Sequence, residues 1–420
     1  MEIIEVRGGR TLAGSIAPPA AKNSVLPLLA ATLLCGEPCR LRGVPRLTDV
    51  DTSLALLTAV GARAAWCGRD VVTAPVPVLG GDIPPRLAGA MRSSVFYLAP
   101  LLVRAGQVRL PVPGGCRLGP RPVDIHLDGL AAMGARVEVG ADAVTLRRAG
   151  RLQGTDFTLR LPSVGATETL LMAAACAQGT TVLRGAACEP EVEDLAGFLS
   201  ACGARITGAG TPVVVIQGRA GGLDGCSYTP LPDRIAATTY AAAAAVAGGD
   251  VTIRRCRPAT FATFLHFLQA AGCRVQTGTG WVRVLRDPRR PLTGGQELFA
   301  SGWPGFATDA APLAAAVLLC ATGPSRIYDG LFPNRFACAA GFAALGAGVQ
   351  ANGRELRIAG GASLRGTVVT APDLRGGAAL VLAGLAARGK TCVLDEGHIR
   401  RGYQALPAEL ASLGAACRIA

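Results

Sequence analysis

Apolar residues recur along this chain at helical spacing, in runs that end six times in Gly-Ala or Gly-Cys. The runs are Leu56–Ala62, Leu130–Ala135, Leu199–Ala204, Leu268–Cys273, Phe342–Ala347 and Leu410–Ala415. Their glycines are Gly61, Gly134, Gly203, Gly272, Gly346 and Gly414, and the successive differences between these numbers run from 68 to 74. Glycine in a left-handed conformation commonly ends a helix. A near-fixed period therefore indicates six repeated supersecondary units.

Most units also contain an earlier helix of small residues that ends in glycine and leads into a strand. Examples are Leu26–Gly36, Thr169–Gly179, Thr238–Gly248 and Ala378–Gly389. The predicted unit is thus helix, strand, helix, strand, strand. Alanine and glycine fill these first helices so heavily that we expect them to be buried on several sides. Six units of this kind divide naturally into two domains of three.

Polar and charged residues stand at the starts of these first helices. The stretches are Lys22-Asn23, Met91-Arg92-Ser93, Ser163–Thr167, Asp233-Arg234, Thr308-Asp309 and Asp373–Arg375. Ser, Thr, Asn and Asp are ordinary helix N-caps, but capping does not explain cations, which the positive end of a helix disfavours. Cations gathered at helix starts indicate that an anion binds there. We therefore predict a polyanionic substrate.

Charge and cysteine content narrow the class of protein. The net charge is +13, but the chain has forty arginines and two lysines, its basic runs are short and its aromatic residues are few. This pattern disfavours nucleic acid as a partner. The fourteen cysteines form no CxxC pair, and the chain has three histidines, so we expect no metal site and take the buried cysteines as small core residues.

The cellular location is predicted from the absence of targeting and membrane-spanning segments. Met1–Glu5 lacks the basic and apolar regions of a secretory signal, and the apolar run Ala236–Ala247 is too short to span a bilayer. We expect a cytoplasmic protein with reduced thiols and no membrane insertion. Oligomeric state stays open.

A loop rich in proline and glycine, Pro111–Asp124, holds one cysteine beside two arginines. The loop composition forbids a helix or a central strand. Nearby cations favour thiolate over thiol, so Cys116, with Arg117 and Arg121 close in sequence, should ionise more easily than a core cysteine. The alternative is a turn that happens to hold a cysteine.

Across all six units the chain resembles the UDP-N-acetylglucosamine enolpyruvyl transferase family. The resemblance rests on Ala21–Asn23, Asp49–Thr52, Met91–Ser94, Pro113–Asp124, Pro162–Thr167, Glu189–Glu191, Leu231–Ile235, Thr308-Asp309, Asn334–Phe336, Asp373–Arg375 and His398–Tyr403. It implies an α/β fold of two inside-out α/β barrel domains, each of three repeats, with the active site in the interdomain cleft. It places the first domain at 22–231 and the second at 1–21 and 232–420. The chain would start in the second domain, build the first and return.

The resemblance also implies a reaction. The enolpyruvyl group of phosphoenolpyruvate passes to the 3-hydroxyl of UDP-N-acetylglucosamine and phosphate is released, the first committed step of peptidoglycan synthesis. Cys116 matches the proton donor that fosfomycin alkylates, and Asp309 matches the proposed base. The residues that match catalytic positions are Cys116, Asp309, Lys22 and Arg401. Those that match phosphoenolpyruvate contacts are Lys22, Asn23, Arg121, Arg375 and Arg401. Those that match nucleotide-sugar contacts are Asn23, Arg92, Arg121, Pro122, Val123, Asp124, Ile125, Ser163, Val164, Gly165, Asp309 and Leu331. The family implies no cofactor and no metal.

Some residues admit a simpler reading, and some depart from the family. Asp309 has the alternative role of capping its helix, and Asp233 with Arg234 that of a surface pair. The segment Ala310–Leu313 lacks the usual glutamine, Pro333 replaces a glutamate, and Arg400 replaces an aspartate beside Arg401. We expect Arg400 to make the surroundings of Arg401 more positive. A divergent paralogue with another acceptor and a binding or regulatory copy stay open as alternatives.

Overall fold

The computed structural model describes residues 1–111 and 123–420, and these form two compact units. The terminal unit consists of Met1–Pro19 and Pro232–Ala420. The middle unit consists of the described residues between Ala20 and Leu231. Each unit contains three sheets and a hydrophobic core of its own.

The middle unit carries three of the six sequence repeats. Its helices are α1 (Lys22–Ala31), α2 (Thr48–Ala59), α3 (Pro85–Ala90), α4 (Leu98–Ala105), α5 (Asp124–Ala132), α6 (Val164–Ala175) and α7 (Pro190–Ala201), with 3-10 turns η1 (Thr32–Leu34) and η2 (Arg92–Tyr97). One sheet runs β13 (Ser227–Tyr228), β3 (Cys39–Leu41), β5 (Asp70–Ala74), β4 (Arg63–Cys67). A second runs β11 (Arg205–Thr207), β12 (Val213–Gln217), β10 (Thr180–Arg184), β9 (Asp156–Thr158), and the third β6 (Gln107–Pro111), β8 (Ala143–Arg147), β7 (Arg136–Val139).

The terminal unit carries the other three repeats. Its helices are α8 (Arg234–Ala247), α9 (Ala262–Ala270), α10 (Ala311–Leu318), α11 (Ala339–Ala344), α12 (Leu374–Ala386) and α13 (Leu406–Ser412), with 3-10 turns η3 (Pro258–Phe261), η4 (Thr308–Ala310) and η5 (Ile399–Arg401). One sheet runs β22 (Val368–Thr370), β23 (Lys390–Asp395), β1 (Glu2–Arg7), β24 (Ala416–Ile419). A second runs β15 (Arg274–Gly278), β16 (Trp281–Arg286), β14 (Gly249–Arg254), β2 (Leu12–Ile16). The third runs β18 (Phe306–Ala307), β17 (Glu297–Ser301), β19 (Ser325–Asp329), β21 (Glu355–Ile358), β20 (Val349–Asn352).

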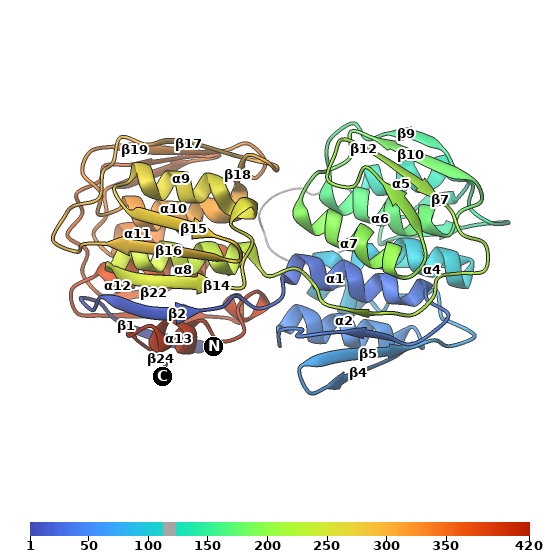
Figure 1. The fold of residues 1–420 in the computed structure, drawn as a ribbon, viewed down its shortest axis with the longest axis horizontal. Helices are drawn as coiled ribbons and strands as arrows, with labels where there is room; N and C mark the ends of the chain where they lie inside the picture. Colours follow the sequence, from blue (N-terminus) through green and yellow to red (C-terminus); the bar gives the residue numbers. More distant parts are fainter. Residues whose placement is uncertain (112–122) are drawn as a thin grey trace. The chain divides into compact units, whose positions relative to one another are not determined.

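In each unit the first helix of every repeat lies inside, and the sheets lie outside. In the terminal unit α8, α10 and α12 pack against one another, and Ala241–Ala245 in α8 are fully buried. Figure 1 shows β17 and β19 along one side of this unit and β2 along another, with α10 and α8 between them. Small side chains let these helices approach closely while their whole circumference is covered. The predicted burial of the first helices is confirmed.

The second helix of every repeat ends as the sequence predicts. Gly61, Gly134, Gly203, Gly272, Gly346 and Gly414 all have positive φ, from 91° to 101°. After α2, for example, the amide of Gly61 donates to Thr58 and that of Ala62 donates to Leu57. This pair of bonds is the Schellman motif. The α/β fold class, with repeats of helix, strand, helix, strand and strand, is confirmed.

The sixth repeat is completed by the start of the chain. After α13 it contributes only β24, and the missing strand is β1, which lies between β23 and β24. β1 pairs antiparallel with both neighbours, with Glu2 opposite Asp395 and Ile4 opposite Ile419. β2 likewise joins the second sheet by pairing parallel to β14. Residues 1–19 therefore belong to the terminal unit.

None of the helices in the described part of the chain combines the length and the apolar character that crossing a membrane requires.

Candidate active site

The Asp309 carboxylate in the terminal unit is held between two buried arginines. One oxygen, Oδ1, lies 3.1 Å from Nη2 of Arg335, and the other, Oδ2, lies 3.1 Å from Nη2 and 3.2 Å from Nε of Arg375. The side chain of Asp309 is 30% exposed, whereas those of Arg335 and Arg375 are 1% and 5% exposed. The turn η4 that holds Asp309 has no side-chain cap, so the capping alternative is wrong. The two arginines fix the orientation of this carboxylate.

Arg335 is itself anchored from behind by the fully buried Asp329. Oδ2 of Asp329 lies 3.3 Å from Nε of Arg335. Oδ1 of Asp329 accepts hydrogen bonds from the amides of Leu331 and Phe332 at 2.8 Å and 2.7 Å. One carboxylate therefore positions both an arginine of the Asp309 cluster and the turn that exposes the predicted site residue Leu331. Arg335 lies in Asn334–Phe336, one of the stretches that carry the family resemblance, but it was not among the predicted site residues.

Arg375 lies in the first turn of α12 with one donor unused. Asp373 caps this helix by accepting from the amides of Arg375 and Gly376 at 2.9 Å and 3.0 Å. Nη1 of Arg375 is buried and has no hydrogen-bond partner among the described residues. Burial disfavours the charge, yet Asp309, Tyr403 and Asp233 together raise the pKa of Arg375 above its ordinary value. A fixed cation with an unused buried donor is suited to bind an anion.

Asp233 and Arg234, at the start of α8, are not a surface pair. Asp233 is buried and caps the helix by accepting from the amides of Ile235 and Ala236 at 2.8 Å and 2.9 Å. The guanidinium of Arg234 lies over the ring of Trp303, 5.9 Å from its centroid. Helices α8 and α12 pack against each other. Their starts lie close enough for the charge of Asp233 to raise the pKa of Arg375.

Arg400 and Arg401 close the turn η5 but differ in their surroundings. Arg401 is partly buried, and η5 packs against α12. Arg400 is exposed and binds Glu2 of β1, with Nη2–Oε1 2.5 Å and Nε–Oε2 3.0 Å. The expected gain of positive charge around Arg401 is therefore reduced, because the carboxylate of Glu2 offsets the charge of Arg400.

Lys22, in the first turn of α1 in the middle unit, forms an ion pair with Asp49. Nζ of Lys22 lies 2.6 Å from Oδ2 of Asp49, and their side chains are 11% and 5% exposed. Asp49 belongs to the first turn of α2. A cation at a helix start is unfavourable by itself, and Asp49 offsets that cost. The next predicted site residue, Asn23, is exposed.

Arg92 is the first residue of η2, and its charge affects the pKa of the buried His126 in α5. Nδ1 of His126 lies 2.9 Å from Oγ1 of Thr169 in α6. Burial, and secondarily the charge of Arg92, lower the pKa of His126 to about 4. A Cβ on Gly165 would lie 3.2 Å from Cε1 of His126, so glycine here leaves room for the ring. The starts of η2, α5 and α6 thus share one neighbourhood.

The α6 start also presents predicted nucleotide-sugar contacts. Ser163 caps the helix, and its hydroxyl accepts from the amide of Ala166 at 3.3 Å. Val164 and Gly165 follow in the first turn and are partly buried. Amide groups at a helix start are suited to bind phosphate.

The carboxylate of Asp124, at the start of α5, already has two partners in the structure. It forms an ion pair with Arg160 and accepts from the amide of Ile125 at 2.9 Å. The hydrogen bond from Arg160 holds the pKa of Asp124 below its ordinary value.

A buried carboxyl group lies one helical turn further along α6. Glu168 is 1% exposed, and neither side-chain oxygen has a partner among the described residues. Burial, with the charges of Glu191 and Glu189, raises the pKa of Glu168 well above its ordinary value. This environment favours the neutral form of the Glu168 carboxyl group. No sequence motif pointed to this group.

The structure gathers the predicted residues into two clusters, one in each unit. The terminal unit brings together Asp309 and Arg375, with Arg401 and Leu331 on neighbouring turns. The middle unit holds Lys22, Asn23, Arg92, Val123, Asp124, Ile125, Ser163, Val164 and Gly165 on helix starts or the residues just before them. Cys116, Arg121 and Pro122 lie outside the described residues.

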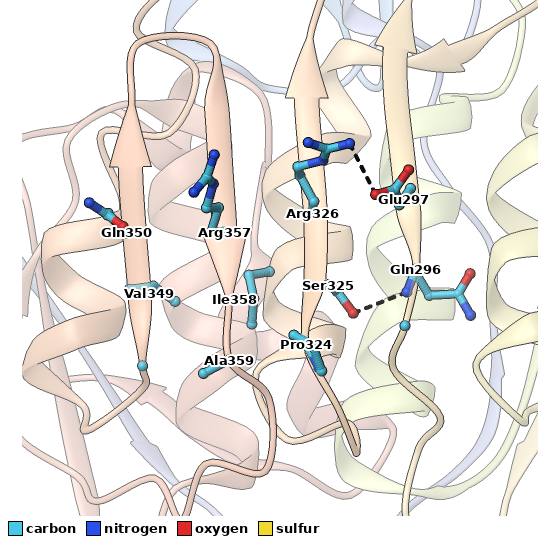
Figure 2. A pocket seen from close by; sticks show the side chains of 12 residues that line it. Gln296, Glu297, Pro324, Ser325, Arg326, Val349, Gln350, Arg357, Ile358 and Ala359 are labelled. Carbon is cyan, nitrogen blue, oxygen red and sulfur yellow. Dashed lines mark hydrogen bonds and ion pairs between the residues drawn. The ribbon is translucent and has the colours of Figure 1, made fainter.

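A surface pocket elsewhere in the terminal unit contains none of the predicted site residues. Figure 2 shows this pocket, of about 590 Å³, on the sheet that contains β17, β19, β21 and β20. Arg326 and Glu297, which line it, form an ion pair of 3.0 Å. Paired surface charges of this kind do not indicate a binding site.

Comparison with known proteins gives a consistent result over the whole chain. The family model described as EPSP synthase (3-phosphoshikimate 1-carboxyvinyltransferase) matches residues 6–410. The UDP-N-acetylglucosamine 1-carboxyvinyltransferase of Coxiella burnetii (strain RSA 493 / Nine Mile phase I) is 42% identical over 419 residues, which cover 100% of this chain and 96% of that relative. UDP-N-acetylglucosamine 1-carboxyvinyltransferase 2 of Caldanaerobacter subterraneus subsp. tengcongensis is 39% identical over 411 residues, 98% of each protein.

Solved structures agree with this match. The enolpyruvyl transferase NikO from Streptomyces tendae has a TM-score of 0.88 and 27% identity, covering 100% of this chain and 98% of that one. EPSP synthase from Acinetobacter baumannii, with a TM-score of 0.74 and 17% identity over 100% of both chains, supports the fold alone. The family resemblance inferred from the motifs is confirmed. The chain belongs to the EPSP synthase (3-phosphoshikimate 1-carboxyvinyltransferase) family.

Proposed function

We propose that this protein transfers the enolpyruvyl group of phosphoenolpyruvate to the 3-hydroxyl of UDP-N-acetylglucosamine and releases phosphate. Support comes from the relatives named UDP-N-acetylglucosamine 1-carboxyvinyltransferase, which are 39% and 42% identical over nearly the whole chain. The structural observation that carries the proposal is the Asp309 carboxylate between Arg335 and Arg375. In this arrangement the carboxylate that we propose as the base lies beside a cation that has an unused donor.

Phosphoenolpyruvate carries a phosphate and a carboxylate, and the candidate residues supply cations for both. Arg375 offers its buried Nη1, and Arg401 lies on η5, which packs against α12. Lys22 and Arg121 complete the proposed clamp, and Asn23 adds an amide. Fixed cations stabilise the negative charge that moves onto phosphate as the carbon–oxygen bond breaks.

Three proton transfers accompany the reaction, and two side chains are proposed for them. Cys116 donates a proton to the methylene carbon, and the sugar oxygen then bonds to the neighbouring carbon. Asp309 accepts the proton that the 3-hydroxyl loses. The thiolate of Cys116 takes back a proton from the new methyl group, the bond to phosphate breaks, and the double bond is restored. The products are the enolpyruvyl ether and inorganic phosphate.

The nucleotide sugar is proposed to bind at the helix starts of the middle unit and at the Leu331 turn. Arg92 and the amides at the start of α6 are suited to the diphosphate. The proposed contacts are Asn23, Arg92, Arg121, Pro122, Val123, Asp124, Ile125, Ser163, Val164, Gly165, Asp309 and Leu331. For Asp124 to contact a ligand, its ion pair with Arg160 must accommodate that ligand.

Phosphate release from phosphoenolpyruvate tests the function directly. We expect release with UDP-N-acetylglucosamine, and none with phosphoenolpyruvate alone or with shikimate 3-phosphate. Release with shikimate 3-phosphate instead would contradict the proposed acceptor.

The chain has two lysines, which provide a matched pair of variants. Lys22→Gln should lower kcat/KM by about 10²-fold or more, because it removes a charge from the clamp, whereas Lys390→Gln breaks only a surface pair with Glu5.

The same proposal places the reaction in the cytoplasm. The structure joins none of the described cysteines in a disulfide, which fits a reducing compartment.

A further inference from the structure

Four cysteines from distant parts of the sequence converge inside the middle unit. The Sγ atoms of Cys35, Cys39 and Cys202 all lie within 4.8 Å of one another, and all three residues are buried. The Sγ–Sγ distance from Cys35 to Cys202 is 3.7 Å. Cys226 adds a fourth sulfur, 3.3 Å from that of Cys202. We call these residues the four-cysteine cluster.

The mutual separations of the Cys35, Cys39 and Cys202 sulfurs are compatible with three corners of a tetrahedral thiolate site. A zinc ion lies about 2.3 Å from each thiolate sulfur, which places the four sulfurs about 3.8 Å from one another. Cys35 and Cys39 are separated by three residues, within the two to four that commonly separate paired zinc ligands. Cys226 is partly exposed, so the cluster has one side open for an ion to enter. Its sulfur is close to that of Cys202 but outside the group of three mutually close sulfurs, so binding an ion would require the Cys226 side chain to turn toward Cys35 and Cys39.

Each cysteine stands at a position that the backbone fixes independently. Cys39 begins β3, and Cys202 is the C-cap of α7. The carbonyl of Cys202 accepts from the amide of Asp224 at 2.9 Å and from Nη1 of Arg219 at 3.3 Å. The carbonyl of Cys226 accepts from the amide of Arg40 at 2.8 Å. Ligands held in this way are preorganised, as in structural metal sites.

Packing alone does not explain the convergence. Cysteine serves elsewhere in this chain as a single small core residue, as at Cys176, the buried C-cap of α6. The four-cysteine cluster instead joins the end of η1, the start of β3, the end of α7 and the residue before β13. An ion held there would tie these four parts of the middle unit together. Soft thiolate ligands without histidine or carboxylate favour zinc among the common divalent ions.

We propose that the four-cysteine cluster is a structural zinc site, in which Zn²⁺ is bound by the thiolates of Cys35, Cys39, Cys202 and Cys226. Each thiol releases its proton to solvent as its sulfur binds the ion, and no electron is transferred. This site is independent of the proposed enzymatic activity.

The test uses the full-length protein produced with added zinc sulfate and purified without chelator. We expect about one zinc ion per chain by mass spectrometry of the metal. Protein reconstituted with Co²⁺ should show the intense absorption of tetrahedral cobalt thiolate. Cys202→Ser and Cys226→Ser should each bind less than about a tenth as much zinc. Cys176→Ser replaces another buried C-cap cysteine of the same unit and should bind as much as wild type.

Wild-type protein decides the question even if Cys202→Ser fails to fold, because its zinc content and cobalt spectrum need no variant. Chelation of the wild-type ion should lower the thermal midpoint, and added zinc should restore it. The proposal is overturned if wild-type protein holds less than about a tenth of a zinc ion per chain and gives no cobalt thiolate band. It is equally overturned if intact-protein mass spectrometry finds Cys202 and Cys226 joined in a disulfide after purification in air.

Discussion

The Asp309 carboxylate engages an arginine with each of its oxygens, so its replacement by an amide has two effects. Asp309→Asn turns one acceptor into a donor that faces either Arg335 or Arg375. It also removes the proposed base. We expect kcat to fall by about 10²-fold to 10⁴-fold. Binding of UDP-N-acetylglucosamine, measured by calorimetry, should change far less.

Asp329→Asn is the comparison for this variant, because it weakens the hold on Arg335 and leaves the carboxylate proposed as the base unchanged. It should lower the stability of the terminal unit while kcat stays within about tenfold of wild type. If Asp309→Asn turned over as fast as Asp329→Asn, Asp309 would not be the base.

His126 predicts how stability depends on pH. Its pKa is about 4 in the folded protein and about 6.5 in an unfolded chain. Below pH 6.5 the unfolded chain takes up a proton that the folded protein refuses, so stability is lost as the pH falls toward 4. The loss attributable to this histidine approaches about 3 kcal/mol.

Urea unfolding at pH 4.5, 5.5 and 7 would measure this dependence. His126→Asn keeps a polar group near Thr169 but cannot titrate, so the variant should lose less stability than wild type between pH 7 and 4.5. Thr169→Ser keeps both the histidine and a hydroxyl and should retain the wild-type dependence. Equal pH dependence in wild type and His126→Asn would show that another group is responsible.

Residue types and spacing predicted which side chains stand at helix starts, but not what each one contacts. Capping residues such as Ser163 and Asp373 could be identified because capping is a local interaction. Arg335 could not be placed, because its partners Asp329 and Asp309 reach it only through tertiary packing. Arg400 shows the same limit, since its partner Glu2 lies at the other end of the chain.

At the scale of elements, one glycine at the end of α5 can be tested with a matched control. Gly134 has a φ of 96°, and a Cβ there would contact nothing within 4 Å. Gly134→Ala should therefore lower the free energy of unfolding by about 1–2 kcal/mol through backbone strain alone. Gly89 in α3 is exposed, and a Cβ there also contacts nothing, but its φ is not positive. Gly89→Ala should be neutral or stabilising by about 0.5–1 kcal/mol.

Urea titration of both variants gives the comparison. A Gly134→Ala variant as stable as Gly89→Ala would contradict the assignment of a left-handed helix end.

The sequence repeat predicted the antiparallel hairpins of each unit well and the short parallel strands beside them poorly. Helices and hairpins such as α5, β7 and β8 follow from local periodicity and a glycine signal. Short strands such as β9 and β13 pair parallel to β10 and β3, and two or three residues carry no periodic signal.

The four-cysteine cluster was missed for a related reason. The expectation of no metal rested on the absence of CxxC and on the presence of only three histidines. Cys35 and Cys39 are instead separated by three residues, and folding brings the sulfurs of Cys202 and Cys226 to them.

At the scale of the whole molecule, the two units differ in how the chain builds them. Among the described residues, the strands of the middle unit find all their partners within residues 20–231. The terminal unit needs both ends of the chain. Ile4, Val6 and Leu12 are at most 1% exposed in its core, and β24 pairs only with β1 among the described strands. The assignment of 22–231 and of 1–21 with 232–420 to separate domains stays a prediction about parts that fold independently.

Fragments of the chain test that prediction. A fragment of residues 20–231 should fold alone, because it keeps three sheets and a complete core. A fragment of residues 232–420 should not, because it lacks the strand between β23 and β24 and the partner of β14. Adding a peptide of residues 1–19 should restore a cooperative thermal transition and dispersed amide resonances. A peptide in which Ile4 and Val6 are replaced by aspartate should not, because a charge would enter the core. If the fragment 232–420 folded without the peptide, β1 would be an accessory strand and not the strand that completes the sixth repeat.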